Sequence, residues 1–339
     1  MLKQIITALS DNQSYPHPVD KVEVIQTATS VVFLTGQQVY KIGKPVNFGF
    51  LDLSTLDKRK QNCHNEVRLN SLVSPEMYLG VVPVINHNGF IRLSGGENTT
   101  GEIVEYATKM KQLSQDNILT TLLNQNKVSP QQIKRLAQQI FKFHSEAQKS
   151  AEISKFGELE TVAGNWEEHF EQTKAAVPVM LNREDFEFME QKVRSFIQEN
   201  KNLITNRIIK NNIRHGHGDL HSGNIFLEGK KITLFDRIVF NQRFPCSDVI
   251  SDLAFLAMDL DSLGKENFSH LLVEEYQKLS QDEDIDKLLN FYKCYRAYIR
   301  AKINWFFFNE ATISEAEKLS CKETSQKYFN LALSYAQLF

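Results

Sequence analysis

The stretch HGHGDLHSGN at residues 215–224, followed by IFLEGKKITLFD at residues 225–236, determines how the rest of the chain is interpreted. Two apolar segments there flank the turn Glu228-Gly229-Lys230, a pattern that predicts a short β-hairpin. The hairpin would fold the chain back on itself. We therefore expect Asp236, which follows the second strand, to return to the neighbourhood of Asn224.

Asp219, Asn224 and Asp236 are the types of side chain that phosphoryl transfer requires. One carboxylate, Asp219, would orient the attacking hydroxyl and accept its proton. The amide of Asn224 and the carboxylate of Asp236 would hold Mg²⁺ on a nucleoside triphosphate. Asp, Asn and Gly are also common turn residues, so HGD alone would say little. The complete pattern favours the catalytic interpretation. In it, D-x-x-x-x-N is followed by a hairpin and then by two apolar residues before Asp.

The three histidines of this stretch are open to a second interpretation as a zinc site. His215, His217 and His221 have a spacing typical of metal ligands, yet no fourth Cys or His stands nearby. Three side chains of so short a loop cannot easily converge. We expect His217 to pack beneath the catalytic loop as a hydrogen-bonding residue, and the zinc site stays as the alternative.

Length and composition limit the class of protein. A chain of 339 residues suggests two domains or one two-lobed unit. Lys and Arg number 39 against 41 Asp and Glu, so the net charge of −2 argues against a general nucleic-acid binder. No stretch approaches the ~20 apolar residues of a membrane span. Four cysteines without a Cys-x-x-Cys pair indicate a reducing compartment, so we expect a cytoplasmic protein.

The pattern of hydrophobic residues changes along the chain. Strands are expected at 31–35 and 39–42, joined by a turn at Gly36-Gln37, and again at 81–85, 90–93 and 103–106. Ser54, with Asp57 three residues later, predicts the start of a helix that runs toward Leu72. From about residue 110 the pattern is helical, and Ser129-Pro130 predicts one helix start. Further helices are expected near 165–176, 184–200, 248–260, 265–280, 284–309 and 313–337.

This order of elements predicts an α+β, bilobal, protein kinase-like fold. A small β-rich N-lobe would comprise residues 1–106, and a larger helical C-lobe with the catalytic loop and one embedded hairpin would comprise residues 107–339.

HGDLHSGN with ITLFD after it resembles the catalytic core of the aminoglycoside phosphotransferase (choline kinase-like) family. The chain is also similar to a less characterised bacterial branch of aminoglycoside phosphotransferase-like proteins, over about residues 20 to 310. The segments that carry this similarity are VYKIGKPVNFGFLDLSTLDKR, VEYATKM, HGDLHSGN, DLAFLAMDLD and YRAYIRAK. Members of that branch are often fused to a P-loop ATPase domain. Because Gly43-Lys44 runs into Pro45 and no GxxxxGK[ST] motif occurs, we expect that second module to be absent.

The resemblance implies roles for single residues. Asp219 becomes the catalytic aspartate, and Asn224 and Asp236 become the magnesium ligands. Lys41 takes the place of the phosphate-binding strand lysine, and Glu66 on the following helix is its expected ion-pair partner. Lys44 is a rival for the lysine position. Alternatively, Lys41 is a solvated strand lysine and Glu66 a surface carboxylate.

The resemblance also implies an adenine-binding hinge at Glu105-Tyr106-Ala107, through the backbone groups of Glu105 and Ala107. One departure from protein kinases is plain: residues 29–39 contain only Gly36 and no GxGxxG motif. Further along the chain, Asp248 and Asp252 are one helical turn apart, and the resemblance implies that Asp252 supports the catalytic loop. The four aspartates between 248 and 264 either bind the amines of a cationic acceptor or, as we prefer, form salt bridges with Arg296, Arg300 and Lys302.

We therefore predict an ATP- and Mg²⁺-dependent phosphotransferase that acts on a hydroxyl of a small molecule, with neither nucleic acid nor membrane as partner. The alternative is a nucleotide-binding regulatory module with little or no transfer activity. A protein kinase is less favoured because HGD replaces HRD and because only residues 237–248 separate Asp236 from the next helix.

Overall fold

The computed structural model describes residues 1–49, 51–95, 100–310 and 313–339. The chain forms two compact units, and each is made of two stretches of sequence. Unit 1 contains Met1–Ile118 and Asn224–Gln242, and unit 2 contains Leu119–Gly223 and Arg243–Phe339. Unit 1 is built on an antiparallel sheet and unit 2 is mostly helical, which confirms the predicted α+β class. The lobe boundary expected after Tyr106 falls inside a strand of unit 1.

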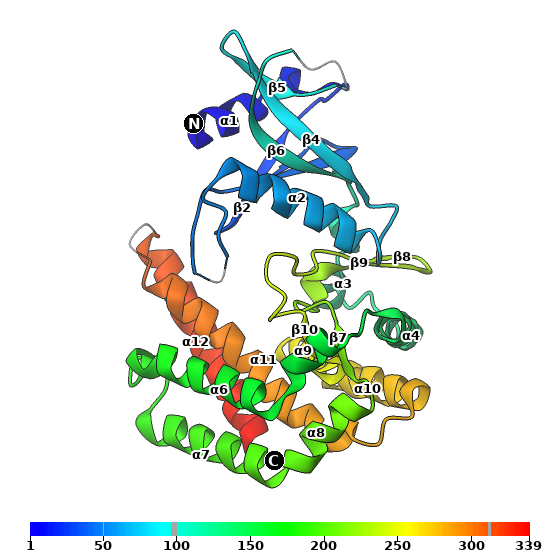
Figure 1. Cartoon of the computed structure of the whole chain (residues 1–339), viewed down its shortest axis with the longest axis vertical. Helices are drawn as coiled ribbons and strands as arrows, with labels where there is room; N and C mark the ends of the chain where they lie inside the picture. Colours follow the sequence, from blue (N-terminus) through cyan, green and yellow to red (C-terminus); the bar gives the residue numbers. More distant parts are fainter. Residues whose placement is uncertain (50, 96–99, 311–312) are drawn as a thin grey trace. The chain divides into compact units, whose positions relative to one another are not determined.

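A six-stranded antiparallel sheet forms the centre of unit 1 (Figure 1). The strand order is β1-β2-β3-β6-β4-β5. Its strands are β1 (Glu23–Gln26), β2 (Ser30–Leu34), β3 (Gln38–Gly43), β4 (Tyr78–His87), β5 (Phe90–Leu93) and β6 (Glu102–Lys111). The predicted turn at Gly36 joins β2 to β3, and the positive φ of 90° there suits a glycine. β6 runs five residues beyond the predicted end at 106, and β1 was not predicted.

Strand alternation separates the two faces of this sheet. On β3, Tyr40 and Ile42 are fully buried in a cluster that includes Ile5 and Leu9 of helix α1 (Leu2–Leu9). Val39 belongs to a different cluster, which is joined by Val67 of helix α2 (Leu56–Asn70). Lys41 alternates with Tyr40 and Ile42, so it shares the face of Val39.

Helix α2 begins one residue later than predicted. Its N-cap is Thr55, whose Oγ1 accepts a hydrogen bond of 3.3 Å from the backbone N–H of Lys58. Ser54 instead donates its hydroxyl proton to Asp52 in the preceding turn, at 2.6 Å. Both residues are good caps, and the competing turn with Asp52 decides between them.

The predicted hairpin after the catalytic loop is confirmed as β8 (Ile225–Glu228) and β9 (Lys231–Leu234), and it belongs to unit 1. The hydroxyl of Ser74 donates to Leu234 O at 2.6 Å. The backbone N–H of Asp236 donates to the Tyr78 hydroxyl at 3.0 Å, and that of Arg237 donates to Asn70 Oδ1 at 2.9 Å. These contacts with α2 and β4 fix the end of the hairpin, and with it Asp236, against the sheet.

Helices and one short two-stranded ribbon make up unit 2 (Figure 1). The ribbon pairs β7 (Ile213–His215) with β10 (Cys246–Asp248). The helices are α3 (Leu119–Asn124), α4 (Pro130–Glu146), α5 (Ala151–Ser154), α6 (Leu159–Thr173), α7 (Arg183–Glu199), α8 (Lys201–Ile209), α9 (Val249–Ser262), α10 (Glu266–Ser280), α11 (Ile285–Phe308) and α12 (Glu315–Ala336). Ser129 and Pro130 start α4 with a capping box, as predicted.

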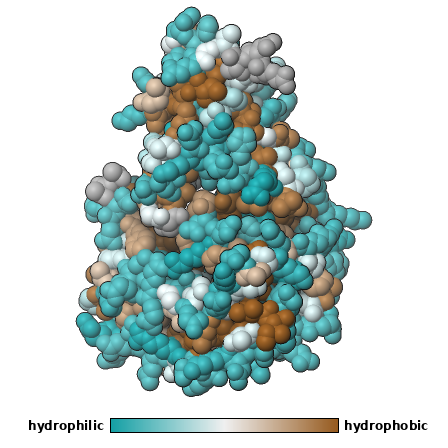
Figure 2. All heavy atoms as spheres, viewed as in Figure 1, coloured by the Kyte–Doolittle hydropathy of each residue, from teal (hydrophilic) through white to brown (hydrophobic). Residues whose placement is uncertain are grey.

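Helix α9 is the core of unit 2, because its first twelve residues are all buried. A helix that is buried on every side must sit between other elements, and α9 packs against α10 and α11. The face of the molecule shown in Figure 2, by contrast, is mostly hydrophilic with scattered hydrophobic areas. Scattered surface hydrophobics are ordinary in globular proteins. Among the described residues, no helix is long and apolar enough to cross a membrane.

A buried ion-pair network fixes the start of α9. The Arg207 guanidinium, 1% exposed, donates to both carboxylate oxygens of Asp248, at 2.7 and 3.0 Å. It also donates to Asp282 at 2.7 Å and to Asp284 at 3.2 Å, in the loop between α10 and α11. Asp248 in turn caps α9 by accepting from the backbone N–H of Ile250 at 3.0 Å. One arginine therefore links α8, the start of α9 and the start of α11.

Replacing Arg207 by Met should destabilise unit 2 by about 3–5 kcal/mol, because Asp248 would stay buried without its charge partner. The measurement is the midpoint of urea unfolding followed by circular dichroism. Lys278→Met is the matched control, since Lys278 pairs only with exposed Glu274 within α10 and its loss should leave the midpoint unchanged. Equal effects of the two substitutions would contradict a structural role for the network.

Candidate active site

Lys41 is held between two carboxylates of unit 1. Its Nζ donates to Glu66 Oε1 at 2.8 Å and to Asp236 Oδ1 at 2.7 Å. Glu66 is buried, and its Oε2 accepts from the Thr108 hydroxyl at 2.9 Å. Burial by itself would lower the pKa of Lys41, but the charges of Asp236 and Glu66 outweigh it and hold the pKa well above the usual range. The alternative of a solvated Lys41 beside a surface Glu66 does not describe this geometry.

Lys44 occupies a different environment. Its Nζ donates to the backbone carbonyl of Thr27 at 2.6 Å, at an exposed position just after β3. The two lysines considered from the sequence therefore differ clearly: Lys41 contacts carboxylates that could orient it, and Lys44 contacts a loop carbonyl.

Asn224 and Asp236 stand at the two ends of the β8–β9 hairpin. The N–H of Phe235 donates to the carbonyl of Asn224 at 3.1 Å, so the expected return of the chain to this region is confirmed. Asp236 has a left-handed φ of 59°, which is uncommon for a residue other than glycine and is tolerated by Asp better than by most. The side chains of this pair offer oxygen ligands, which suit Mg²⁺.

Asp219 belongs to unit 2, on the loop after β7. His221 Nε2 lies 3.5 Å from Asp219 Oδ2. Burial opposes ionisation of Asp219, but the hydrogen bond and charge of His221, with the charges of His217 and Arg300, lower its pKa to about 2. The carboxylate is therefore ionised at neutral pH. A carboxylate with so low a pKa is a weak base, so in a reaction it would mainly accept a hydrogen bond and align the donor.

The histidines of the loop have separate roles. His217 is 1% exposed and its Nδ1 accepts from the N–H of Asp219 at 3.3 Å, which confirms that it packs beneath the loop. His215 lies in β7, and His221 faces Asp219. Among the residues that the structure describes, no group of three or more His, Cys, Asp or Glu side chains could hold a metal ion.

Asp252 of α9 positions the loop that carries Asp219. Its carboxylate accepts from the backbone N–H of His217 at 2.5 Å and from that of Gly218 at 2.9 Å. Arg296 of α11 donates to the carbonyl of Gly218 at 2.9 Å and lies 3.5 Å from Asp252. A Cβ atom added at Gly216 would lie 2.4 Å from Asp252 Oδ2, so only glycine allows this approach. Burial opposes ionisation, but His144 and then Arg296 hold the pKa of Asp252 below its usual range.

A second support for the loop was not predicted. Asp259, two turns after Asp252 on α9, accepts from the N–H of Ser222 at 2.8 Å. Ser222 Oγ also lies 2.6 Å from the Thr120 hydroxyl of α3. The signal in the sequence is the spacing of seven residues, which places Asp252 and Asp259 on one face of a helix.

The acidic stretch after the loop forms internal pairs, as preferred from the sequence, but mostly with other partners. Asp248 pairs with Arg207, and Asp261 pairs with Lys293 at 2.8 Å. Among the ion pairs of the described residues, Arg296 is the one of the three expected cations that approaches an aspartate of this stretch. The buried side chains Arg207 and Lys293 pair with these aspartates instead of Arg300 and Lys302. Which cation pairs with which aspartate depends on tertiary packing.

Glu105 and Ala107 lie elsewhere than expected. Both stand in the middle of β6, where Ala107 is paired with Ile42 of β3 and with Val82 of β4. Glu105 is buried, and its carboxylate accepts from Arg59 Nε at 2.7 Å. The backbone of this segment pairs with β3 and β4 within the sheet, so the segment does not connect the two units. The chain leaves β6 only after Lys111, and residues 112–118 form that exit.

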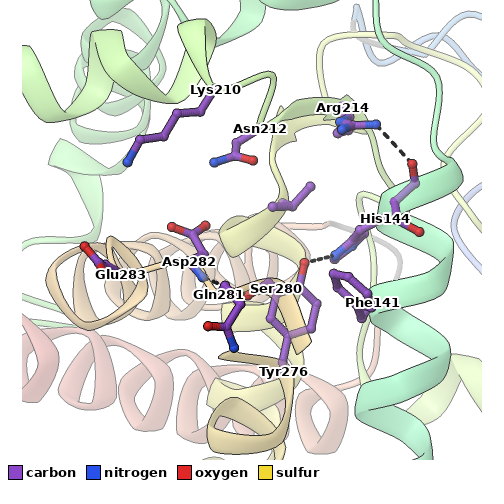
Figure 3. Close-up of a pocket in the computed structure, with 12 residues that line it drawn as sticks. Phe141, His144, Lys210, Asn212, Arg214, Tyr276, Ser280, Gln281, Asp282 and Glu283 are labelled. Carbon is purple, nitrogen blue, oxygen red and sulfur yellow. Dashed lines mark hydrogen bonds between the residues drawn. The ribbon is translucent and has the colours of Figure 1, made fainter. Parts of the chain in front are cut away.

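A pocket of about 350 Å³ lies within unit 2, lined by His144, Tyr276 and residues of the α10–α11 loop (Figure 3). At one wall, His144 Nδ1 lies 2.8 Å from the Tyr276 hydroxyl, and His144 Nε2 lies 3.5 Å from Asp252 Oδ2. Lys210, Arg214 and Asp282 line other parts of it. None of the predicted site residues lines this pocket, and one route from it to the loop that carries Asp219 runs through His144 and Asp252.

Comparison with known sequences gives relatives but no family description. No family model matches the chain. Uncharacterised proteins of Mycobacterium tuberculosis and Mycobacterium bovis are 29% identical to it over 304 residues, which is 89% of this chain. The chain spans only 59% of the length of these relatives.

Comparison with solved structures shows the fold. Aminoglycoside 2'-phosphotransferase-IIIa in its GDP complex is 13% identical, with a TM-score of 0.55 over 97% of both chains. Choline kinase from Cryptosporidium parvum is 12% identical, with a TM-score of 0.54 over 94% of this chain and 89% of the other. A choline/ethanolamine kinase family protein from Mesorhizobium loti is 12% identical, with a TM-score of 0.53 over 99% of both. The chain therefore has the fold of these small-molecule kinases, in agreement with the resemblance found from sequence.

Asp252→Asn should lower stability at pH 7 by about 2 kcal/mol, because two loop amides and Arg296 lose a charged partner. The pKa of Asp252 is depressed by folding, so its stabilisation is complete above the usual carboxyl pKa of about 4 and is lost as pH falls below that value. The variant should therefore show a shallower loss of stability below pH 4. Urea unfolding at several pH values measures both effects. Glu199→Gln, an exposed carboxylate at the end of α7, is the control and should change neither.

Proposed function

We propose that the chain is an ATP- and Mg²⁺-dependent phosphotransferase that transfers the γ-phosphoryl group to a hydroxyl of a small molecule. The observation that carries the proposal is the position of Lys41, whose ammonium is held between buried Glu66 and Asp236. A lysine fixed in this way is ready to bind phosphate oxygens, because its carboxylate partners hold its charge and direction.

Unit 1 would hold the nucleotide. Lys41 would donate to phosphate oxygens, and Asn224 and Asp236 would supply the protein oxygen ligands of Mg²⁺. Two protein ligands suffice, because Mg²⁺ in such sites takes its remaining ligands from phosphates and water. When bound, the ion supplies charge neutralisation on the phosphates. Asp236 now bonds to Lys41 through Oδ1 and is half-exposed, so part of its carboxylate stays open to a ligand.

The adenine contact moves from Glu105 and Ala107 to the exit of β6. Residues 112–118 follow β6. The N–H of Gln112 still donates to Gln37 O at 2.9 Å, so the backbone groups after it would be the first that could meet the edge of a base. Gln112 begins this segment, and its side-chain Oε1 accepts from the N–H of Gly36, which ties the exit to the β2–β3 turn at 2.9 Å. Glu105 would then support the sheet through Arg59 rather than contact the nucleotide.

Asp219 would act in the transfer step. Its carboxylate, ionised at neutral pH, would accept a hydrogen bond from the acceptor hydroxyl and align the oxygen for in-line attack. As the oxygen–phosphorus bond forms and the bond to the β-phosphate oxygen breaks, the hydroxyl proton passes to Asp219. A low pKa suits a loose transition state, in which the proton moves late.

The proposal also includes a small-molecule acceptor and a cytoplasmic location. It includes neither a nucleic acid nor a membrane as partner. The solved neighbours include a choline kinase and an aminoglycoside phosphotransferase, whose acceptors are small alcohols or sugars by name. The competing function, a nucleotide-binding module without transfer activity, differs only in what Asp219 does.

Nucleotide binding should separate the two lysines. Mg²⁺-ATP should raise the melting temperature of the wild type by mass action. Lys41→Ala should remove most of this shift, because the phosphates lose their charged donor. Lys44→Ala is the matched control and should keep the shift, since Lys44 contacts only a loop carbonyl. Differential scanning fluorimetry measures this shift in melting temperature. If both substitutions reduced the shift equally, the assignment of Lys41 would be refuted.

Catalysis should depend on Asp219 while nucleotide binding does not. Asp219→Asn keeps the shape but removes the basic oxygen, so turnover of ATP should fall by about 10²-fold or more. The affinity for Mg²⁺-ATP should stay the same or rise slightly, because repulsion of the phosphates is relieved. Both quantities are measured on one preparation, by coupled ADP release and by calorimetry. Undiminished turnover would exclude Asp219 as the catalytic aspartate, and a wild type without turnover would favour the regulatory module.

A further inference from the structure

His221 is a titratable side chain beside Asp219 to which the proposed reaction gives no role. It follows Asp219 by two residues, and its backbone N–H donates to the carbonyl of Asp219 at 3.1 Å. Its Nε2 lies 3.5 Å from Oδ2 of Asp219, at the outer limit of a hydrogen bond. Both residues belong to unit 2, so this contact lies within one compact unit.

The second contact of the His221 ring shows where its proton lies. The backbone N–H of Gly223 donates to Nδ1 of His221 at 3.1 Å, so Nδ1 is an acceptor. A neutral imidazole that accepts at Nδ1 carries its proton on Nε2. This Nε2–H stands beside an oxygen of Asp219, which only accepts when the carboxylate is ionised. A hydrogen bond between the two side chains would therefore run from His221 to Asp219.

Several contacts hold the His221 ring in this orientation. A Cβ atom added at Gly223 would lie 2.8 Å from Cε1 of His221 and 3.0 Å from its Nδ1, so a side chain there would displace the ring. The ring centre lies 5.7 Å from that of Phe255 on α9. Ser222, the next residue along the chain, is fixed to the same helix by Asp259, which accepts its backbone N–H at 2.8 Å. The imidazole is therefore held in place on both sides.

The charges around His221 favour a proton on its ring. Burial by itself would lower the pKa of His221, but the hydrogen bond and charge of Asp219 and the charge of Asp259 outweigh it and raise the pKa. The charge of Arg300 opposes this rise. A cationic ring carries protons on both nitrogens, and a neutral ring carries its proton on Nε2 because of Gly223. The Nε2–H is therefore present in both charge states.

The two histidines that flank Asp219 contact different parts of it. Nδ1 of His217 accepts from the backbone N–H of Asp219 at 3.3 Å, which fixes the main chain. An aspartate whose main chain is fixed still has two side-chain torsions, χ1 and χ2. Packing covers only part of this carboxylate, since the side chain of Asp219 is 37% exposed. A donor at Oδ2 would give the carboxylate a fixed direction.

We propose that His221 is a positioning residue for the transfer step. It donates Nε2–H to Oδ2 of Asp219 and so fixes the plane of that carboxylate for the acceptor hydroxyl. This inference rests on the proposed function, in which the hydroxyl proton passes to Asp219, and His221 keeps its own proton throughout. Hydrogen bonds of an active site are often long in the unliganded protein and shorten in the complex with substrate, in keeping with the separation of 3.5 Å.

The first experiment tests the contact without any turnover. The histidines of the full chain are labelled with nitrogen-15, and the proton–nitrogen couplings within each ring report which nitrogen is protonated. The signals of His221 are identified by their loss in His221→Phe. At about pH 9, above the usual His pKa of about 6.5, the ring should be protonated at Nε2.

The same spectra, recorded at several pH values, test the partner. Asp219→Asn should lower the pKa of His221, because the charge and the hydrogen bond of the carboxylate favour the cationic ring. A neutral ring protonated at Nδ1 would overturn the proposed contact. An unchanged titration of His221 in Asp219→Asn would overturn it as well.

The second experiment tests the effect on transfer, by coupled ADP release. His221→Phe keeps a ring against Phe255 but removes the donor. It should lower kcat by about 10-fold or more, as expected for the loss of a hydrogen bond to a charged group. The KM for Mg²⁺-ATP should not change. His221→Gln keeps an N–H donor and should recover part of kcat. His270→Phe is the control, because His270 is exposed on α10 and its loss should alter neither constant.

The outcomes separate this inference from the proposed function. If Asp219→Asn abolishes turnover while His221→Phe keeps the wild-type kcat, the phosphotransferase stands and the positioning role fails. If His221→Phe and His221→Gln lower kcat and the midpoint of urea unfolding equally, the role of His221 is structural and the proposal is again overturned. If the wild type turns over no ATP, the proposed function fails and the positioning role fails with it.

Discussion

Much of unit 2 depends on one buried carboxylate, Asp252. Taking a charge out of water is costly, and this charge is retained because two backbone amides, Arg296 and His144 surround it. The amides belong to the loop that carries Asp219. The carboxylate belongs to α9, which is buried on every side and whose start is held by Arg207. The loop that carries Asp219 is therefore fixed to a buried helix, and such a fixed position would suit the alignment of a hydroxyl.

Unit 1 uses the same principle with the opposite charge. Lys41 is a cation on a central strand, and Glu66 and Asp236 approach it from α2 and from the hairpin. Asp236 reaches it with a left-handed backbone, fixed by Tyr78 and Asn70 through the amides of residues 236 and 237. Strain of this kind is usually found where function needs it. The pair Asp236–Lys41 is also the contact that a bound nucleotide would have to share.

The two sets of residues lie in different units, and the chain joins them directly at Gly223–Asn224. The hairpin that follows Asn224 was expected within the helical lobe, but it packs on the sheet of unit 1. Lys41, Asn224 and Asp236 therefore belong to one compact unit, while Asp219 belongs to the other.

Local sequence determined most of the elements and the candidate site residues. The spacing of Asp219, Asn224 and Asp236 around a turn, the caps at Ser129 and the alternation on β3 are local patterns, and the structure has each of them. Tertiary structure decided which buried charges meet. The pairs Asp248–Arg207 and Asp261–Lys293 join segments 41 and 32 residues apart, and no local pattern distinguishes them from Arg300 or Lys302. Tertiary structure also decided that β6 continues past Glu105 and Ala107. The length of this strand depends on its pairing with β3 and β4, and the pattern of residues within one segment carries no information about those partners.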